Sequence, residues 1–177
     1  MFTIEAYQGI THRRRFGTIS RSEVDAMTET ANALTADTIL FQSPASFQPS
    51  TQNVRNIKNF FSNIDRGGRI FVWEPRGKWA ESSQAVVDVC ESSDPVHCVD
   101  PLCNRPLFFG IQQIAYFRLH GFGEPSMYRY SFSDGELKEI CTLVNSLSGS
   151  LSRIYLFFSN VTCYEDALSS AGLAKAG

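Results

Sequence analysis

The sequence predicts an α/β protein built on a parallel sheet, and two observations lead to that prediction. Short segments rich in β-branched and aromatic residues alternate along the chain with segments of helical periodicity. Parallel neighbours in a sheet need crossover connections, which the helical segments supply. The chain has 177 residues, and at about 31 residues per unit of an eight-unit barrel this gives roughly six βα units. The count is about two units short of a closed barrel, and an open doubly wound sheet is the alternative.

Six segments are expected to form the strands, because each is short, β-branched or aromatic, and bounded by turn residues. They are residues 2–7 (FTIEAY), 38–42 (TILFQ), 69–74 (RIFVWE), 96–100 (VHCVD), 114–120 (IAYFRLH) and 153–160 (RIYLFFSN).

Helical segments are predicted between these strands. Ser20-x-x-Glu23 and Ser133-x-x-Glu136 are capping boxes ahead of apolar residues at helical spacing. Further helices are expected to begin at residues 49–51, to include residues 85–90 and to cover residues 164–173. Residues 101–113 have no helical period. No repeat or linker interrupts the chain, which is expected to form a single domain over residues 1–177.

Composition excludes several classes of protein. Hydrophobic residues make up 43% and charged residues 19%, as in an ordinary globular protein. The formal net charge of −2 gives no general attraction to nucleic acid, so nucleic-acid binding stays uncertain and would need a local patch. No apolar run is long enough to span a bilayer, the N-terminus lacks a signal-peptide pattern, and no membrane partner is expected. The 5 cysteines form no C-x-x-C pair, which favours reduced, mostly buried thiols in a cytoplasmic protein.

Polar residues recur at the carboxyl ends of the expected strands. Arg118 and His120 share one face of their strand, since side chains alternate. The same spacing from a preceding apolar residue is found at four other strand ends, namely at Gln42, Glu74, Asp100 and Asn160, and His12 lies just beyond the first strand. Strand ends lie near water, which explains one or two such cases. Parallel α/β folds place their sites at these ends, so the pattern predicts a functional pocket.

Several stretches together resemble the YecE-like family, catalogued as domain of unknown function 72. They are FTIEAYQGITH, ILFQSPASFQPS, WEPRGKW, YFRLHG, YRYSFSDGELKEI and LFFSN, in this order. The resemblance implies a TIM-barrel-like fold whose mouth is lined by the matched polar residues. Family members usually begin with a further stretch that carries a Gly-Thr-Ser-Gly-Trp-like strand. Nothing here corresponds to it, so an incomplete barrel is expected, in agreement with the length.

The resemblance implies less about activity than about fold. Many family members read Glu-Phe-Arg-His-Pro-Ser-Trp where this chain has Glu74-Pro75-Arg76-Gly77-Lys78-Trp79, so any role of that histidine is in doubt here. The family has no settled activity. Its likeness to metal-dependent endonuclease-type and sugar-isomerase-type barrels is a fold-level analogy, which does not fix chemistry.

Three residues are the candidates for acid/base catalysis. Glu74 and Asp100 are carboxylates at consecutive strand ends, where two neighbouring carboxyl groups can share acid and base roles. His120 is a candidate general base or acid. The alternative for Glu74 is an internal ion pair with Arg118 or Arg76. No cofactor is predicted; a divalent metal on these three residues is a weaker hypothesis, because Arg118 would repel the cation.

Other polar residues indicate an anionic ligand. Arg76 and Arg118 suit bidentate recognition of phosphate or carboxylate, and helix N-termini point to the same side of the sheet. Expected substrate-binding residues are His12, Gln42, Arg76, Arg118, Tyr130 and Asn160. The run Arg13, Arg14 and Arg15 is read as a solvated loop. Tyr128, Tyr130 and Phe132 either cover the pocket or pack against Phe108 and Phe109.

Two functions are therefore carried forward. The first is a strand-end pocket for a small anionic ligand, phosphate-bearing or sugar-like, with hydrolase-type acid/base chemistry. The second is a non-catalytic binding or assembly module, or a truncated barrel. The strands at residues 2–7 and 153–160 would then be sheet edges, which a homo-oligomer can cover. No P-loop, G-x-S-x-G or H-E-x-x-H pattern is present.

Overall fold

The computed structural model describes residues 2–18, 21–122 and 129–176. Its strands are β1 (Thr3–Glu5), β2 (Thr38–Gln42), β3 (Ile70–Glu74), β4 (Val96–Val99), β5 (Ile114–Leu119) and β6 (Arg153–Phe158). Its α-helices are α1 (Arg21–Ala33), α2 (Thr51–Asn63), α3 (Ser83–Ser93), α4 (Asp134–Ser148) and α5 (Cys163–Ala176). A π-helical turn, η1 (Gly9–Arg13), follows β1, and a 3-10 turn, η2 (Gly77–Glu81), follows β3.

The strand order distinguishes a barrel-like sheet from a doubly wound one. The strands are all parallel and follow one another in the order β1-β2-β3-β4-β5-β6. A doubly wound sheet reverses direction partway along its strand order, whereas a TIM barrel adds each strand on the same side of the last. The prediction of a parallel, incomplete TIM-barrel-like α/β fold is therefore confirmed.

Contacts divide the chain into two compact units. The first contains residues 1–97 and 107–111, and the second contains residues 98–106 and 112–177. Strand β4 contributes to both units, with Val96 and His97 in the first and Cys98 and Val99 in the second. The expectation of a single domain stays a prediction.

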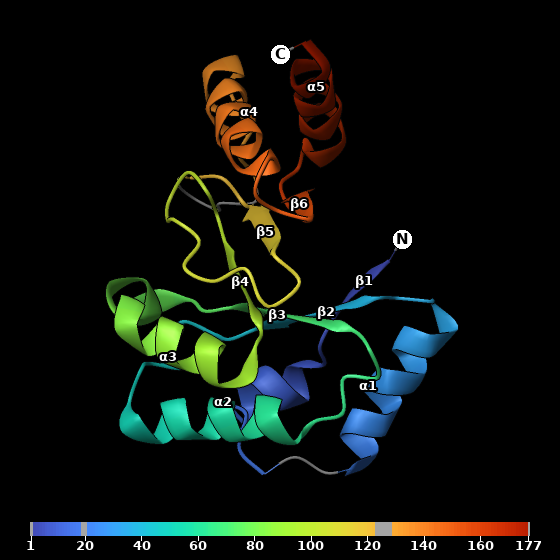
Figure 1. The fold of residues 1–177 in the computed structure, drawn as a ribbon, viewed down its shortest axis with the longest axis vertical. Helices are drawn as coiled ribbons and strands as arrows, with labels where there is room; N and C mark the ends of the chain where they lie inside the picture. Colours follow the sequence, from blue (N-terminus) through green and yellow to red (C-terminus); the bar gives the residue numbers. More distant parts are fainter. Residues whose placement is uncertain (1, 19–20, 123–128, 177) are drawn as a thin grey trace. The chain divides into compact units, whose positions relative to one another are not determined.

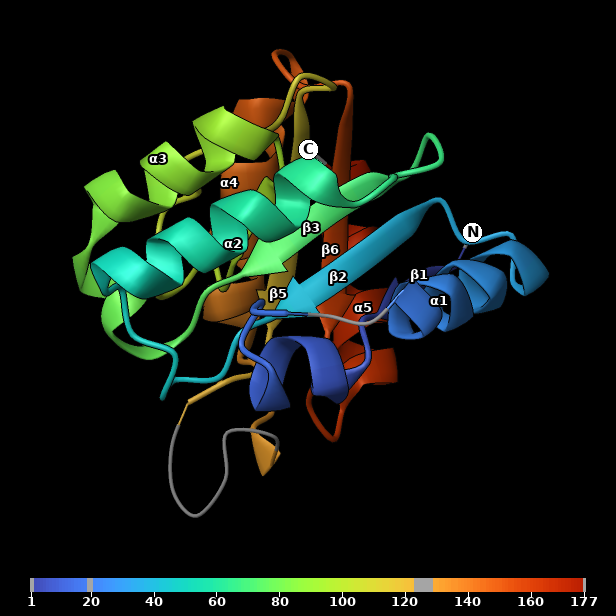
Figure 2. The same cartoon turned by 90° about the horizontal axis from the view of Figure 1, so that it is seen from below.

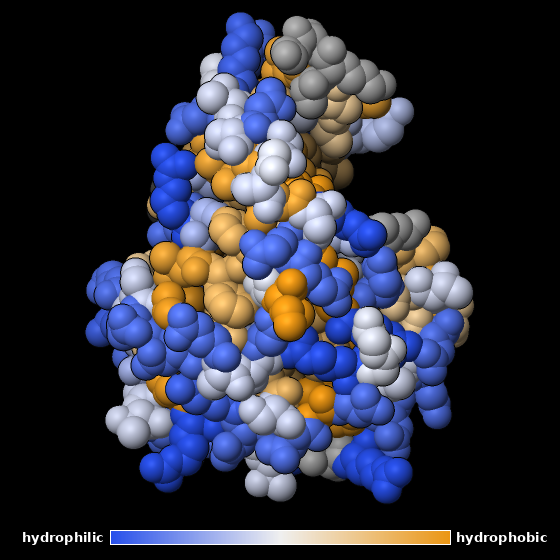
Figure 3. All heavy atoms as spheres, viewed as in Figure 1, coloured by the Kyte–Doolittle hydropathy of each residue, from blue (hydrophilic) through white to orange (hydrophobic). Residues whose placement is uncertain are grey.

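Aromatic packing fills the core of the first unit. Helices α1, α2 and α3 cover one face of its strands, as Figure 1 and Figure 2 show. Phe41 and Phe71 point to that face, and their ring centroids lie 5.1 Å apart. Phe60 and Phe61 of α2 meet Phe41 edge to face at 5.3 and 5.2 Å. Hydrophilic side chains cover most of the outer surface of these helices in Figure 3.

The second unit is built on the β5–β6 pair. The two strands are in register over six residue pairs, and α4 and α5 pack against one face of them. Leu119 of β5 is fully buried with Leu137 and Ile140 of α4. The Ser133–Glu136 capping box is present at the start of α4, as predicted.

Most predicted elements are present, with different ends. Ser50 caps α2, and its side chain accepts the backbone N–H of Asn53 at 3.2 Å. Helices α3 and α5 extend beyond the residues predicted for them. The residues added to α3 are polar and carry no apolar period. Ser20, the first residue of the other predicted capping box, lies outside the described residues. The region from residue 101 to 113 contains turns and no helix, as expected.

Candidate functional site

Polar side chains of the first unit meet where β2 and β3 end. Gln42 and Glu74 are register partners and the last residues of these strands. Arg76 follows two residues after Glu74, and its Nε lies 2.8 Å from Glu74 Oε1. The alternative interpretation of Glu74, an ion pair with Arg76, is therefore confirmed.

Gln42 links this ion pair to a second carboxylate. In the amide orientation that satisfies both ends of the side chain, its nitrogen donates to Glu5 Oε1 at 3.2 Å. Its oxygen accepts from the guanidinium of Arg76, with contacts of 2.7 to 3.1 Å to the three nitrogens. Glu5, Gln42, Glu74 and Arg76 form a continuous network across three adjacent strands, here called the strand-end network. Glu5 was missed in the sequence, because the residue two places before it, Thr3, is polar and the apolar-to-polar spacing of the other strands is absent.

The strand-end network combines burial with partial access to solvent. The side chain of Glu74 is 8% exposed to solvent, and that of Arg76 is 24% exposed. A buried carboxylate needs charge-assisted partners, and the guanidinium supplies them. Two carboxylates and one guanidinium give the network a formal charge of −1. Its one cation is held in place by Glu74 and Gln42.

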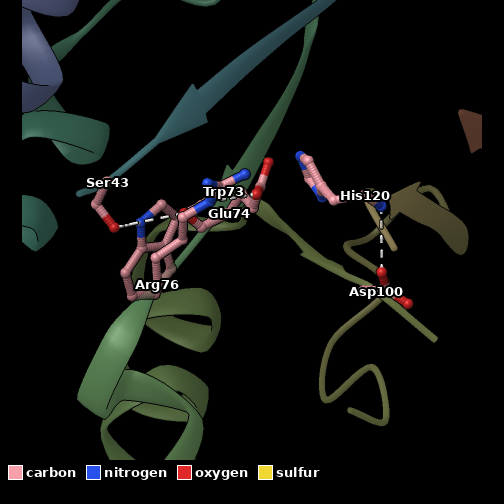
Figure 4. Close-up of polar contacts among 6 residues, drawn as sticks. All are labelled: Ser43, Trp73, Glu74, Arg76, Asp100 and His120. Carbon is pink, nitrogen blue, oxygen red and sulfur yellow. Dashed lines mark hydrogen bonds and ion pairs between the residues drawn. The ribbon is translucent and has the colours of Figure 1, made fainter. Parts of the chain in front are cut away.

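The backbone that carries Arg76 is fixed by a glycine and two tryptophans. Gly77 has φ +67°, and a Cβ there would lie 2.7 Å from the carbonyl oxygen of Ala45. Trp79 is fully buried, and its indole N–H donates to the carbonyl of Phe47. Trp73 Nε1 donates to Ser43 Oγ at 3.3 Å, as Figure 4 shows. The turn after β3 is therefore held by packing and hydrogen bonds that do not involve the Arg76 side chain.

In the second unit, Asp100 ties two strand ends together. Its Oδ1 accepts the backbone N–H of Leu102 at 3.1 Å, and its Oδ2 accepts that of His120 at 3.3 Å. His120 is buried, and its imidazole points away from Asp100 in Figure 4. Both carboxylate oxygens of Asp100 thus contact backbone amides, which favours a positioning role. Catalysis by Asp100 and His120 stays a prediction.

Arg118 lies on the opposite face of β5 from the helices. Its register partner is Phe157, and Leu119, the next residue, packs against α4. Arg118 is half-buried. Arg118 therefore points away from the helices, and its predicted role in ligand binding stays a prediction.

Tyr130 packs against the end of β5. Gly121 has φ +90°, and a Cβ there would lie 2.1 Å from Tyr130 Cβ, so the glycine that ends this segment makes room for the tyrosine. The Tyr130 hydroxyl donates to Glu136 Oε1, and this hydrogen bond raises the pKa of Tyr130. Phe132 is buried and lies edge to face with Phe158 at 5.6 Å, so packing is its role. Tyr128 lies outside the described residues.

Asn160 follows β6, and the alternation predicted for it, two places after Phe158, puts it on the same side as Phe158. Leu156 and Phe158 pack against the helix-side cluster of the second unit, so Asn160 continues the helix-facing side rather than the side of Arg118. Its Nδ2 donates to the Tyr130 carbonyl at 2.8 Å and to Asp166 Oδ2 of α5 at 2.6 Å. Strand β6 is apolar on both faces, so its sequence does not reveal which face points to the helices. Ligand binding by Asn160 stays a prediction.

The basic run after β1 is mainly a surface feature. Arg13, Arg14 and Arg15 are exposed, and Arg14 pairs with Glu23 at 3.0 Å, which confirms the solvated-loop reading. His12 is half-buried in η1, and its Nδ1 lies 2.8 Å from Thr11 Oγ1. Neither contact tests the predicted role of His12 in substrate binding.

Three further features bear on the kind of protein. Within the described ranges, no three His, Cys, Asp or Glu side chains gather as a metal site would require. None of the helices in the described part of the chain has the length and apolar character of a membrane span.

All five cysteines are free of disulfides, and Cys90, Cys98 and Cys141 are buried, as expected. Burial raises the pKa of Cys90, which makes that thiol a poor nucleophile.

The fold and the strand-end network define an incomplete TIM-barrel-like α/β protein with polar residues at the carboxyl ends of its strands. The chain belongs to the family described as "Protein of unknown function DUF72", whose profile matches residues 1–175. The resemblance to YecE-like proteins is consistent with this family. Among curated proteins, none is similar enough to count as a match.

Solved structures of the same family share the fold. A DUF72 family protein from Thermotoga maritima MSB8 is 21% identical with a TM-score of 0.73, over 99% of this chain and 72% of that one. A DUF72 family protein from Enterococcus faecalis V583 is 17% identical with a TM-score of 0.74, over 98% of this chain and 74% of that one. At these identities the similarity concerns the fold alone.

Proposed function

We propose that this protein binds a small anionic ligand, phosphate-bearing or sugar-like, at the strand-end network of its first unit. The observation that carries the proposal is the position of Arg76. Its guanidinium is partly exposed, and it is oriented by Glu74 from one strand and Gln42 from the next. Sites in parallel α/β folds lie at the carboxyl ends of strands, where this network lies.

The chemistry of Arg76 supports an anionic ligand. A guanidinium presents five N–H donors in a planar fork that matches a phosphate or carboxylate. The Gln42 amide oxygen is a neutral acceptor, and a charged oxygen forms a hydrogen bond roughly twice as strong. A ligand oxygen would therefore replace the Gln42 contact, while Glu74 keeps the guanidinium in its orientation. The amide of Gln42 and the carboxylate of Glu5 then remain for hydroxyl groups of the ligand.

Hydrolysis is the second part of this proposal. Glu74 is the most buried carboxylate of the network and lies beside the group that would hold the anion. That position suits a general base acting on water next to the ligand. Asp100 and His120 are the other proposed acid/base groups. The favoured alternative is a non-catalytic binding module, because both oxygens of Asp100 are already held by backbone amides.

Binding is tested with Arg76→Met and Arg76→Lys, using inorganic phosphate and a sugar phosphate as probes in titration calorimetry. Removal of the guanidinium is expected to weaken binding at least tenfold, and Lys to restore only part of it because the fork is lost. Arg14→Met is the matched control, since Arg14 also pairs through Nε with a glutamate, at 3.0 Å, but on an exposed surface. Unchanged affinity in Arg76→Met would show that the proposal is wrong.

Turnover is tested separately with a phosphoester and glycoside panel, with and without divalent metals. Activity that Glu74→Gln abolishes while binding persists would support the hydrolase. A blank panel with retained binding would favour the binding module. The disulfide-free cysteines support a reducing, cytoplasmic setting for either function.

A further inference from the structure

Strand β6 is an edge strand of a kind that soluble proteins usually protect. Within the described residues it pairs with β5 alone, so every second backbone N–H and C=O points away from the sheet. It is six residues long, whereas the other edge strand, β1, has three residues and ends on an exposed glutamate. Long, flat edges are templates for pairing with another chain, and short or charged ones are not.

Strand β6 has no bulge, no proline and no charge beyond its first residue. Its register with β5 runs through six consecutive pairs from Arg153 to Phe158 without a bulge. The sequence RIYLFF contains no proline, and its only charge is Arg153 at the start. Ile154, Leu156 and the two phenylalanines are all partly exposed. Within the described residues, the outer edge of this apolar strand is therefore not paired with another strand.

Further apolar side chains are exposed on the segment that follows β6. Val161 is 65% exposed, and Tyr164 and Leu168 of α5 are 70% and 57% exposed. Tyr164 and Leu168 are four residues apart and therefore neighbours on one side of the helix. Since α5 packs against β6, this patch lies on the same unit as the open edge.

We propose that two copies of this chain pair through β6, antiparallel, about a twofold axis perpendicular to the sheet that passes midway between the two Leu156 residues. This register places Leu156 opposite itself, Tyr155 opposite Phe157, and Ile154 opposite Phe158. Residues opposite each other in an antiparallel pair point to the same face, so helix-side residues meet helix-side residues. The strand is self-complementary in this register: aromatic residues pair with aromatic residues on one face, and apolar residues pair on the other.

Charge is compatible with the same register. Arg153 of one copy lies opposite Ser159 of the other, so the only charge on the strand meets a neutral residue rather than its own copy. Like charges directly opposite each other are destabilising. The pairing also satisfies the outward backbone groups of both strands, which no side-chain contact can do.

In this register, two substitutions of Ser159 are expected to change the dimer affinity in opposite directions. Ser159→Arg places two Arg–Arg pairs in the interface and is expected to weaken dimerisation about tenfold, whereas Ser159→Glu creates two Arg–Glu pairs and is expected to strengthen it. Arg153→Glu combined with Ser159→Arg is expected to restore the affinity. Ile111→Glu is the control, because Ile111 is a large hydrophobic residue that is 84% exposed and belongs to the other unit.

Sedimentation velocity over a concentration series measures the dimer constant of each variant, with circular dichroism as the check on folding. In the wild-type protein, hydrogen exchange of the β6 amides is expected to slow as the fraction of dimer rises with protein concentration. A wild-type protein that stays monomeric up to several hundred micromolar would overturn the proposal. So would Ser159→Arg and Ser159→Glu shifting the constant in the same direction, or a dimer whose β6 amides exchange as fast as in the monomer.

Discussion

His97 Nδ1 accepts the backbone N–H of Leu107 at 3.1 Å, and the His97 N–H donates to the carbonyl of Phe108 at 3.0 Å. This residue of β4 therefore holds the segment from residue 107 to 111, which returns to the first unit from a distant part of the sequence. The side chain is buried, and desolvation lowers its pKa from 6.5 to about 4. The neutral imidazole is the form that can accept the Leu107 amide.

This pair predicts a loss of stability in acid. Between pH 6.5 and about 4 the unfolded state binds a proton at His97 that the folded state does not, so the free energy of unfolding rises with pH across that window. The contribution is fully present above pH 6.5, is lost as pH falls toward 4, and amounts to roughly 3 kcal/mol. His97→Asn keeps an acceptor but does not titrate. The gap in urea-unfolding free energy between wild type and His97→Asn should close on acidification; a constant gap would contradict the assignment.

Gly121 is expected to tolerate no side chain. Gly121→Ala adds a Cβ at φ +90° that would collide with Tyr130 Cβ, and a destabilisation of about 2 kcal/mol or more is expected. Gly149→Ala is the control, since that glycine has ordinary φ and nothing within 4 Å of an added Cβ. Thermal unfolding of the two variants measures the difference. Equal melting temperatures would show that the Tyr130 contact is not required.

Gly77 is expected to matter for ligand binding as well as for stability. Gly77→Ala places a Cβ 2.7 Å from the Ala45 carbonyl oxygen and should displace the turn that carries Arg76. Gly68→Ala has a similar backbone strain, φ +78°, but nothing within 4 Å, so it isolates the steric part. We expect both to lose stability and only Gly77→Ala to lose phosphate affinity. Equal affinity in the two variants would argue that the turn does not position Arg76.

Asp166 is a buried carboxylate whose partners are neutral. It accepts from Asn160 Nδ2 at 2.6 Å and from Thr162 Oγ1 at 2.8 Å. Asp166→Ala leaves these buried donors without an acceptor, and about 2 kcal/mol of destabilisation is expected. Glu165→Ala, at the neighbouring exposed position, should change the unfolding free energy by less than about 0.5 kcal/mol. An unchanged free energy of unfolding in Asp166→Ala would mean that water replaces the carboxylate as acceptor.

Local patterns in the sequence were enough to predict the strands, the main helices and the parallel sheet. Ser133 and Glu136 form a cap within four residues, and β2 and β3 are apolar runs long enough to be strands. Phe41 and Phe71 lie in segments predicted as strands, and Phe60 lies at an apolar position of a predicted helix. Such signals are local in the chain, because capping and strand formation depend on neighbouring residues.

The site was predicted less completely, for physical reasons that differ between residues. Gln42 and Glu74 were identified because alternation in an amphipathic strand end is visible in the sequence. The spacing from Phe158 to Asn160 was identified, but the sequence did not show that this side of β6 faces the helices, because β6 is apolar on both sides.

By itself the sequence determined the class of fold, the order of its strands and helices, and the polar character of the strand ends, since all three follow from local periodicity. Only the tertiary structure decided that Arg76 pairs with Glu74, that Gln42 brings in Glu5, and that Asp100 holds the backbone of His120. Those choices depend on register and on the competition of several acceptors for one donor. Glu5, Gln42 and Glu74 lie on three different strands, and Asp100 and His120 are 20 residues apart, so no single segment encodes these contacts.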